Sequence, residues 1–171
     1  MNSLKAHSIL ALIFTMFNAY SQTCMLESEI PSTTPDSRFT DNGDGTVSDH
    51  GTELMWQKCA LGLSGNDCSS GSEMHLTWEQ ALEEASNNSL AEYENWRLPN
   101  LKELLSIVEQ RCKDPAINVN YFPISSPNYI WTSSPAASPT EHAWRVVFSY
   151  GGSSDISRDI PQYVRLVRYI Q

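Results

Sequence analysis

The side chains best suited to bind a ligand are arginines near the C-terminal end of the chain. Between Trp144 and Gln171, four arginines face only two acidic residues, so this end is basic within an acidic protein. A guanidinium group can donate two parallel hydrogen bonds to a sulfate or carboxylate, and it also stacks on tyrosine rings. We therefore predict a binding surface for a glycan or an anionic polysaccharide. Its candidate members are Arg145, Arg158, Arg165, Tyr129 and Tyr150.

The alternative is that these arginines pair with carboxylates of the same domain, because charges near a core are usually paired. A similar structural role is expected for Arg97, which lies between Trp96 and Leu98 directly before a predicted helix. We expect its guanidinium group to be partly buried and paired with a carboxylate or with backbone carbonyls.

Three aspartates, Asp41, Asp44 and Asp49, could hold a calcium ion. An EF-hand aligned on the second glycine of this segment would have Thr40 at its first position and Gly51 at its twelfth. Both positions need carboxylate ligands, so the EF-hand is excluded. A looser calcium site remains as an alternative, whereas Asx turns explain the same residues without a metal. We expect no cofactor.

The sequence contains no arrangement typical of a catalytic site. It has no Gly-x-Ser-x-Gly elbow, no His-Glu-x-x-His motif and no phosphate-binding glycine loop. His50, His75 and His142 are scattered singly among polar segments, where a solvated imidazole is expected. Glu103 follows Asn100 by three residues in a predicted capping box, which gives it a structural role. We therefore predict that the protein is not an enzyme.

Residues 1–21 have the pattern of a signal peptide. Lys5 precedes an apolar run at 9–17, and Ala19 and Ser21 are small residues at the positions that a signal peptidase reads. The run is too short to span a bilayer, and no second stretch of about 18 apolar residues follows. We expect an exported protein without a membrane span, located in the periplasm, at the cell surface or in the medium. Lipidation at Cys24 is the alternative.

Export determines how the four cysteines are interpreted. An even number of cysteines in an oxidising compartment predicts two disulfides, for which three pairings exist. Cys59 and Cys68 bracket a loop rich in Gly, Ser and Asn that can turn back on itself, so we predict that they pair. Cys24–Cys112 then follows by elimination. Zinc is disfavoured because no Cys-x-x-Cys pair or nearby histidine pair is present.

Composition limits the partners and the domain count. The formal net charge is −9, with 11 Lys and Arg against 20 Asp and Glu, and removal of Lys5 makes it −10. An acidic surface repels phosphate backbones, so no nucleic-acid partner is expected. Residues 22–37 are rich in Pro, Ser and Thr and are predicted to be a solvated tether. Residues 38–171 are long enough for one domain with a core.

Local patterns predict mixed helices and strands within this domain. Thr77 and Asn100 each start a helix, the first ending near Ala85, because Gln or Glu follows three residues later. All five tryptophans are expected in the core, since each falls in a predicted element. Strands are expected in an antiparallel meander over 38–57, at 129–134, in a hairpin that turns at 151–152, and at 163–169.

An ordered series of segments between residues 38 and 169 resembles the Lcl C-terminal domain family. The segments are DNGDGTV at 41–47, LMWQ at 54–57, WRLPN at 96–100 with EL at 103–104, PAI at 115–117, YFP at 121–123, WTSS at 131–134 and VRLVR at 164–168, with Trp78 and Ala81 between the second and third. So many spaced matches over one domain are specific.

The resemblance implies a domain of α+β class with a C-type-lectin-like fold, distantly similar to formylglycine-generating enzymes. We expect two helices packed on short antiparallel sheets, with long loops and disulfides. The family's best-known member is the head of a bacterial collagen-like adhesin, which forms a trimer and binds sulfated glycosaminoglycans. A trimer is therefore implied, although this chain has no Gly-x-y stalk to enforce it.

Two functions of different class follow from the sequence. The first is an exported adhesion or envelope-attachment module that recognises a glycan or an anionic polysaccharide. The second is a structural or assembly domain that docks onto another exported protein. Oxidase chemistry of the formylglycine-generating type is disfavoured, because it needs a cysteine pair near the C-terminal region and Cys112 is the last cysteine.

Overall fold

The computed structural model describes residues 21–124 and 129–170, so the predicted signal peptide lies outside it except for Ser21. The described part is of α+β class, with two α-helices and several short antiparallel sheets. Its larger sheet has the strand order β11-β4-β3-β2, and each neighbouring pair is antiparallel. Its strands are β2 (Phe39–Asp41), β3 (Thr46–Asp49), β4 (Leu54–Gln57) and β11 (Val167–Tyr169).

The meander predicted over residues 38–57 is therefore confirmed. The strand predicted at 163–169 is shorter than expected, because only its last three residues pair with β4. Before them, Leu61 N donates to Val164 O at 2.8 Å, and Gln57 N donates to Leu166 O at 3.0 Å. These irregular bonds join residues 164–166 to the segment 57–61, and all three residues are buried, so this part of the chain is interior.

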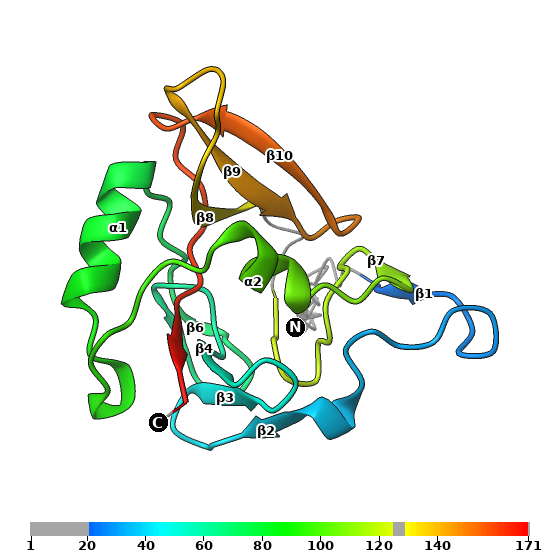
Figure 1. The fold of residues 1–171 in the computed structure, drawn as a ribbon. Helices are drawn as coiled ribbons and strands as arrows, with labels where there is room; N and C mark the ends of the chain where they lie inside the picture. The colour runs from blue at the N-terminus through cyan, green and yellow to red at the C-terminus, as the bar shows by residue number, and fades with distance from the viewer. Residues whose placement is uncertain (1–20, 125–128, 171) are drawn as a thin grey trace, which may run out of the picture.

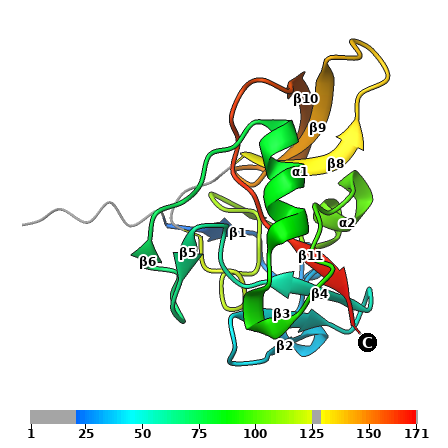
Figure 2. The ribbon, with the colours of Figure 1, turned by 90° about the vertical axis from the view of Figure 1, so that its left-hand side faces the viewer.

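A second sheet has the order β10-β9-β8 and contains the predicted hairpin. Its strands are β8 (Tyr129–Pro135), β9 (His142–Val147) and β10 (Gly152–Ser157). Two further antiparallel pairs are short, namely β1 (Thr23–Cys24) with β7 (Cys112–Lys113) and β5 (Leu63–Ser64) with β6 (Ser70–Gly71). Figures 1 and 2 show the two larger sheets at opposite ends of the molecule.

Both predicted helices begin where their capping boxes indicate. In α1 (Trp78–Asn87), the Thr77 side chain accepts from Gln80 N, and the Gln80 side chain accepts from Thr77 N. In α2 (Leu101–Ser106), Asn100 and Glu103 form the same reciprocal pair. The first helix is two residues longer than expected. Two 3-10 turns, η1 (Asp36–Arg38) and η2 (Leu90–Glu92), complete the helical segments described.

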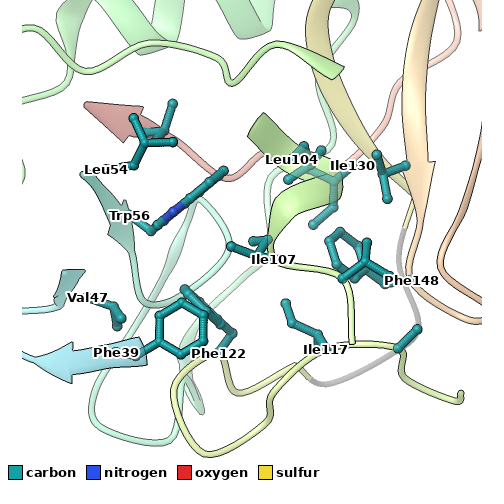
Figure 3. Packing of buried hydrophobic residues seen from close by; sticks show 14 residues of the cluster. Phe39, Val47, Leu54, Trp56, Leu104, Ile107, Ile117, Phe122, Ile130 and Phe148 are labelled. Carbon is teal, nitrogen blue, oxygen red and sulfur yellow. The ribbon is translucent and has the colours of Figure 1, made fainter. Parts of the chain in front are cut away.

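The core consists of two clusters of buried hydrophobic side chains. One lies between the larger sheet, α2 and the loop that carries Ile117 and Phe122, as Figure 3 shows. The other joins α1 to β8 and to residues 164–166. The expectation of five core tryptophans holds for Trp56, Trp96 and Trp131. Trp78 and Trp144 are only half-buried.

The segment 22–37, predicted to be a solvated tether, instead packs on the domain. Most of its side chains are exposed, as its composition indicates, but Thr34 is fully buried. The carboxylate of Glu109 accepts hydrogen bonds from the hydroxyl groups of Ser32 and Thr34, at 2.6 and 2.8 Å, and from the Thr34 amide at 3.0 Å. The buried Glu109 carboxylate thus holds Ser32 and Thr34 against the domain through hydrogen bonds, although these polar side chains bury little apolar area.

Both predicted disulfides are present, Cys24–Cys112 and Cys59–Cys68, and no described cysteine is free. The first joins β1 to β7 and adds a covalent bond to the contacts of the N-terminal segment. The second closes the loop that leads from β4 to β6. Because Cys24 is bonded to Cys112, its sulfur is not available for the alternative of lipidation.

Candidate ligand-binding sites

Tyr129 and Arg145 lie together on the second sheet. The guanidinium carbon of Arg145 lies 4.1 Å from the centre of the Tyr129 ring. Arg145 Nε donates to Ser154 Oγ at 3.1 Å, and Nη1 donates to Gln162 Oε1 at 2.9 Å. The stack and both hydrogen bonds fix the plane of the half-buried guanidinium group, while 42% of Tyr129 remains exposed. Among the described residues, Nη2 of Arg145 has no partner.

Tyr150 lies at the same end of this sheet. It belongs to the turn after Val147, and Val147 is the residue opposite Tyr129 in the β8–β9 register. The Tyr150 ring covers Gly152, where a Cβ atom would lie 2.2 Å from the ring carbon Cε2. Glycine at this position therefore permits the close approach, and 64% of Tyr150 stays exposed. We call Tyr129, Arg145 and Tyr150 the Tyr–Arg surface.

Arg158 does not join this group, because it follows the other end of β10. Its guanidinium carbon lies 4.4 Å from the centre of the Trp78 ring, and its Nε donates to the His142 carbonyl at 3.2 Å. His142 itself, expected to be solvated, hydrogen-bonds through Nδ1 to Asp155 at 2.7 Å. Arg158 is thus placed as a link between α1 and the second sheet.

Arg165 is a correction to the predicted binding surface, since only 1% of the residue is exposed. Its Nη1 donates to the carbonyl oxygens of Gln57 and Lys58 at the end of β4. Burial lowers the pKa of Arg165 to about 10, against the opposing field of Glu73. Its side chain therefore binds backbone inside the domain and cannot reach an external polysaccharide.

The three aspartates considered for calcium are each engaged by protein groups. Asp41, Asp44 and Asp49 accept from the amides of Gly43, Thr46 and Gly51 at 2.9–3.0 Å, which are the Asx turns of the alternative interpretation. Each amide lies two residues beyond its acceptor, so the contacts are local. In the described part of the chain, no group of three His, Cys, Asp or Glu residues could hold a metal ion.

Cations also neutralise two of these aspartates. The fully buried Asp49 carboxylate accepts from Nε and Nη2 of Arg38 at 2.6 and 2.5 Å. Although burial opposes ionisation, the hydrogen bonds from Arg38 and Thr52 lower the pKa of Asp49. Asp41 pairs with Lys58 Nζ at 2.6 Å, and this bond lowers the pKa of Asp41. Two of the three aspartates that the calcium alternative would need are therefore paired with protein cations.

The structure adds a feature that sequence patterns did not reveal, a cleft of about 620 Å³ beside the C-terminal half of α1. We call it the α1 cleft. Three segments line it, namely the turn 41–45, the loop 57–66 and residues 84–90. Figure 2 shows the end of α1 beside the β5–β6 pair and β3. Apart from the turn 41–45, which belongs to the DNGDGTV segment, the lining consists mainly of Gly, Asn, Ser and Leu and carries no motif along the sequence.

Comparisons with known proteins identify the domain. The family model described as the Lcl C-terminal domain matches residues 45–168 of the 171 in the chain. A comparison with curated proteins found no match. Among the residues that the structure describes, none forms a helix both long and apolar enough to cross a membrane.

Proposed function

The chain belongs to the Lcl C-terminal domain family, and on this premise we propose that it is an exported, non-catalytic module that binds a glycan or an anionic polysaccharide. The two disulfides support export, because such bonds persist in oxidising compartments. We extend the proposal to a C-type-lectin-like fold, which the two helices, short antiparallel sheets and long loops support.

The observation that carries the proposal is the Arg145 guanidinium group, fixed against the exposed Tyr129 ring with Nη2 uncommitted among the described residues. A stacked and hydrogen-bonded guanidinium loses little freedom when it pairs with a sulfate or carboxylate. The exposed rings of Tyr129 and Tyr150 offer apolar faces on which sugar rings can stack. An adhesive or envelope-attachment role needs only such weak contacts repeated along a polymer.

The test is binding of heparin and alginate at low and high salt. Variants Tyr129→Ala, Tyr150→Ala and Arg145→Gln should each weaken binding at least about threefold, the effect expected from one lost contact. Tyr169→Ala is the matched control, because Tyr169 is also an exposed tyrosine, 63% accessible and stacked on Arg97, but it lies on the other sheet. Wild-type binding should weaken as salt screens the charges.

Absence of binding at low salt by the folded wild-type protein would refute polyanion recognition. Recovery of one stoichiometric exported protein with the chain would then favour the docking function. The family resemblance implies a trimer, and analytical ultracentrifugation of the same samples measures the number of chains.

A further inference from the structure

We propose that the α1 cleft is a second binding site, for an uncharged saccharide unit of up to about three sugars, separate from the Tyr–Arg surface. Its volume of about 620 Å³ falls within the range of 300–1,000 Å³ that is typical of small-molecule sites. The proposal does not depend on polyanion binding, because the cleft and the Tyr–Arg surface share no residue.

The cleft is preorganised, because hydrogen bonds tie the loop 57–66 to each of the other two segments that line it. Gln57 Nε2 donates to Asn88 Oδ1 at 3.0 Å, which connects the end of β4 to the residue that caps α1. Lys58, only 6% exposed, connects the same strand end to the turn through its 2.6 Å bond to Asp41. The Cys59–Cys68 disulfide closes the loop. A ligand would therefore order little of the protein.

Two glycines make the loop compact. A Cβ atom on Gly62 would lie 2.2 Å from the Ser72 carbonyl oxygen, and one on Gly71 would lie 2.2 Å from the Gly62 carbonyl oxygen. Both glycines also have positive φ, near +91° and +96°. Only glycine allows the two backbones to approach so closely, so this side of the cleft is set by main-chain contacts.

Three of the polar side chains that line the cleft are free to bind a ligand. Within the described residues, the carboxylate of Glu84 and the side-chain amides of Asn66 and Asn87 have no hydrogen-bond partner. Sugar hydroxyl groups both donate and accept, so they match a mixture of carboxylate oxygens and amide groups. Leu61 and Leu90 supply apolar area for the C–H faces of a sugar ring.

The charge of the lining determines which saccharides the α1 cleft can bind. Lys58 and Asp41 neutralise each other at 2.6 Å, so the remaining lining charges are those of Asp44 and Glu84, both negative. A sulfated or uronic sugar would bring a further negative charge against them, and such like-charge contacts disfavour binding. The cleft therefore suits uncharged sugars, whereas the Tyr–Arg surface offers a cation.

The experiment is an amide NMR titration of the disulfide-bonded protein with four uncharged trisaccharides, maltotriose, cellotriose, mannotriose and chitotriose. An alginate trisaccharide is the acidic comparison. We expect at least one uncharged trisaccharide to shift the amides of residues 43–45 and 84–90. Glu84→Ala or Asn87→Ala should weaken this binding about fivefold, as for the loss of one hydrogen bond. Glu83→Ala is the matched control, because Glu83 neighbours Glu84 on α1 but is exposed and does not line the cleft.

Three results would overturn the proposal. The first is no shift in these amides with any uncharged trisaccharide at about 10 mM, the weak end of measurable affinity. The second is tighter binding of the acidic trisaccharide than of the uncharged ones in the cleft. The third is an equal loss of trisaccharide affinity in Glu83→Ala and Glu84→Ala. Tyr129→Ala should leave the cleft shifts unchanged. Substitutions on the Tyr–Arg surface therefore test polysaccharide binding, and substitutions of Glu84 and Asn87 test the cleft, so the two proposals can fail separately.

Discussion

Replacement of Glu109 by glutamine should loosen the N-terminal segment and remove a pH-dependent part of the stability. Glu109 is only 4% exposed, and its carboxylate accepts from Ser32, Thr33 and Thr34. Burial alone would raise the pKa of Glu109, but these hydrogen bonds outweigh it and lower the pKa from 4.5 to about 2. Glutamine keeps the shape of the Glu109 side chain, but the NH2 of its amide group is a donor and would face the donors of Ser32, Thr33 and Thr34.

The pKa shift of Glu109 gives the size of its contribution to the folding free energy. A depression from 4.5 to about 2 corresponds to about 3 kcal/mol of folding free energy from the ionised form of Glu109. Because the folded-state pKa is the lower one, this contribution is complete above the unfolded-state pKa of 4.5. It is lost as the pH falls toward 2, with about 2 kcal/mol already gone at pH 3. Glu109→Gln should not show this part of the pH dependence.

The assay is urea unfolding of both proteins, followed by tryptophan fluorescence at pH 7, 5, 4 and 3. At pH 7, Glu109→Gln should lower the free energy of unfolding by about 3 kcal/mol, or the melting temperature by about 6–12 °C. The difference from wild type should shrink by about 2 kcal/mol at pH 3. Glu83→Gln, at an exposed position, is the control. A difference between Glu109→Gln and wild type that is equal at pH 3 and pH 7 would refute the reasoning.

Two other ion pairs give predictions that thermal denaturation checks. Asp49→Asn should lower the free energy of unfolding by about 3–5 kcal/mol, because it leaves the Arg38 guanidinium group without its fully buried counterion; an unchanged melting temperature would contradict this. Arg97→Ala should cost less, about 1 kcal/mol, because 35% of the Arg97 side chain is exposed where it binds Glu103 at 2.8 Å. Lost ligand binding with an unchanged melting curve would instead make Arg97 a site residue.

The parts of the fold that the sequence predicts are those decided by neighbouring residues. The capping boxes at Thr77 and Asn100 join groups three residues apart, and each starts a helix as expected. The Asx turn at Asp41 joins groups two residues apart. The Cys59–Cys68 bond closes a short loop with a sequence separation of 9. In each case the partners are near along the chain, so residue type and spacing contain most of the information.

Contacts between distant residues account for the errors. The excess of arginines near the C-terminal end predicts a surface position for Arg165, but its acceptor carbonyls lie 108 and 107 residues earlier in the chain. The segment 22–37 is rich in Pro, Ser and Thr, which predicts a solvated tether, yet the carboxylate that binds Thr34 lies 75 residues later. The α1 cleft brings together three separate segments. No local pattern contains the information that these groups meet.

The two proposed sites carry opposite charges, so salt should affect ligand binding at the two sites differently. Polyanion binding at the Tyr–Arg surface depends on the Arg145 cation and should weaken as salt rises, since exposed charges are screened beyond about 8 Å at physiological ionic strength. Binding of an uncharged sugar in the α1 cleft releases no counterions, so its affinity should be nearly independent of salt. An exported protein with both sites could hold an uncharged sugar unit while a polyanion dissociates. Salt dependence therefore tells which site a given saccharide occupies.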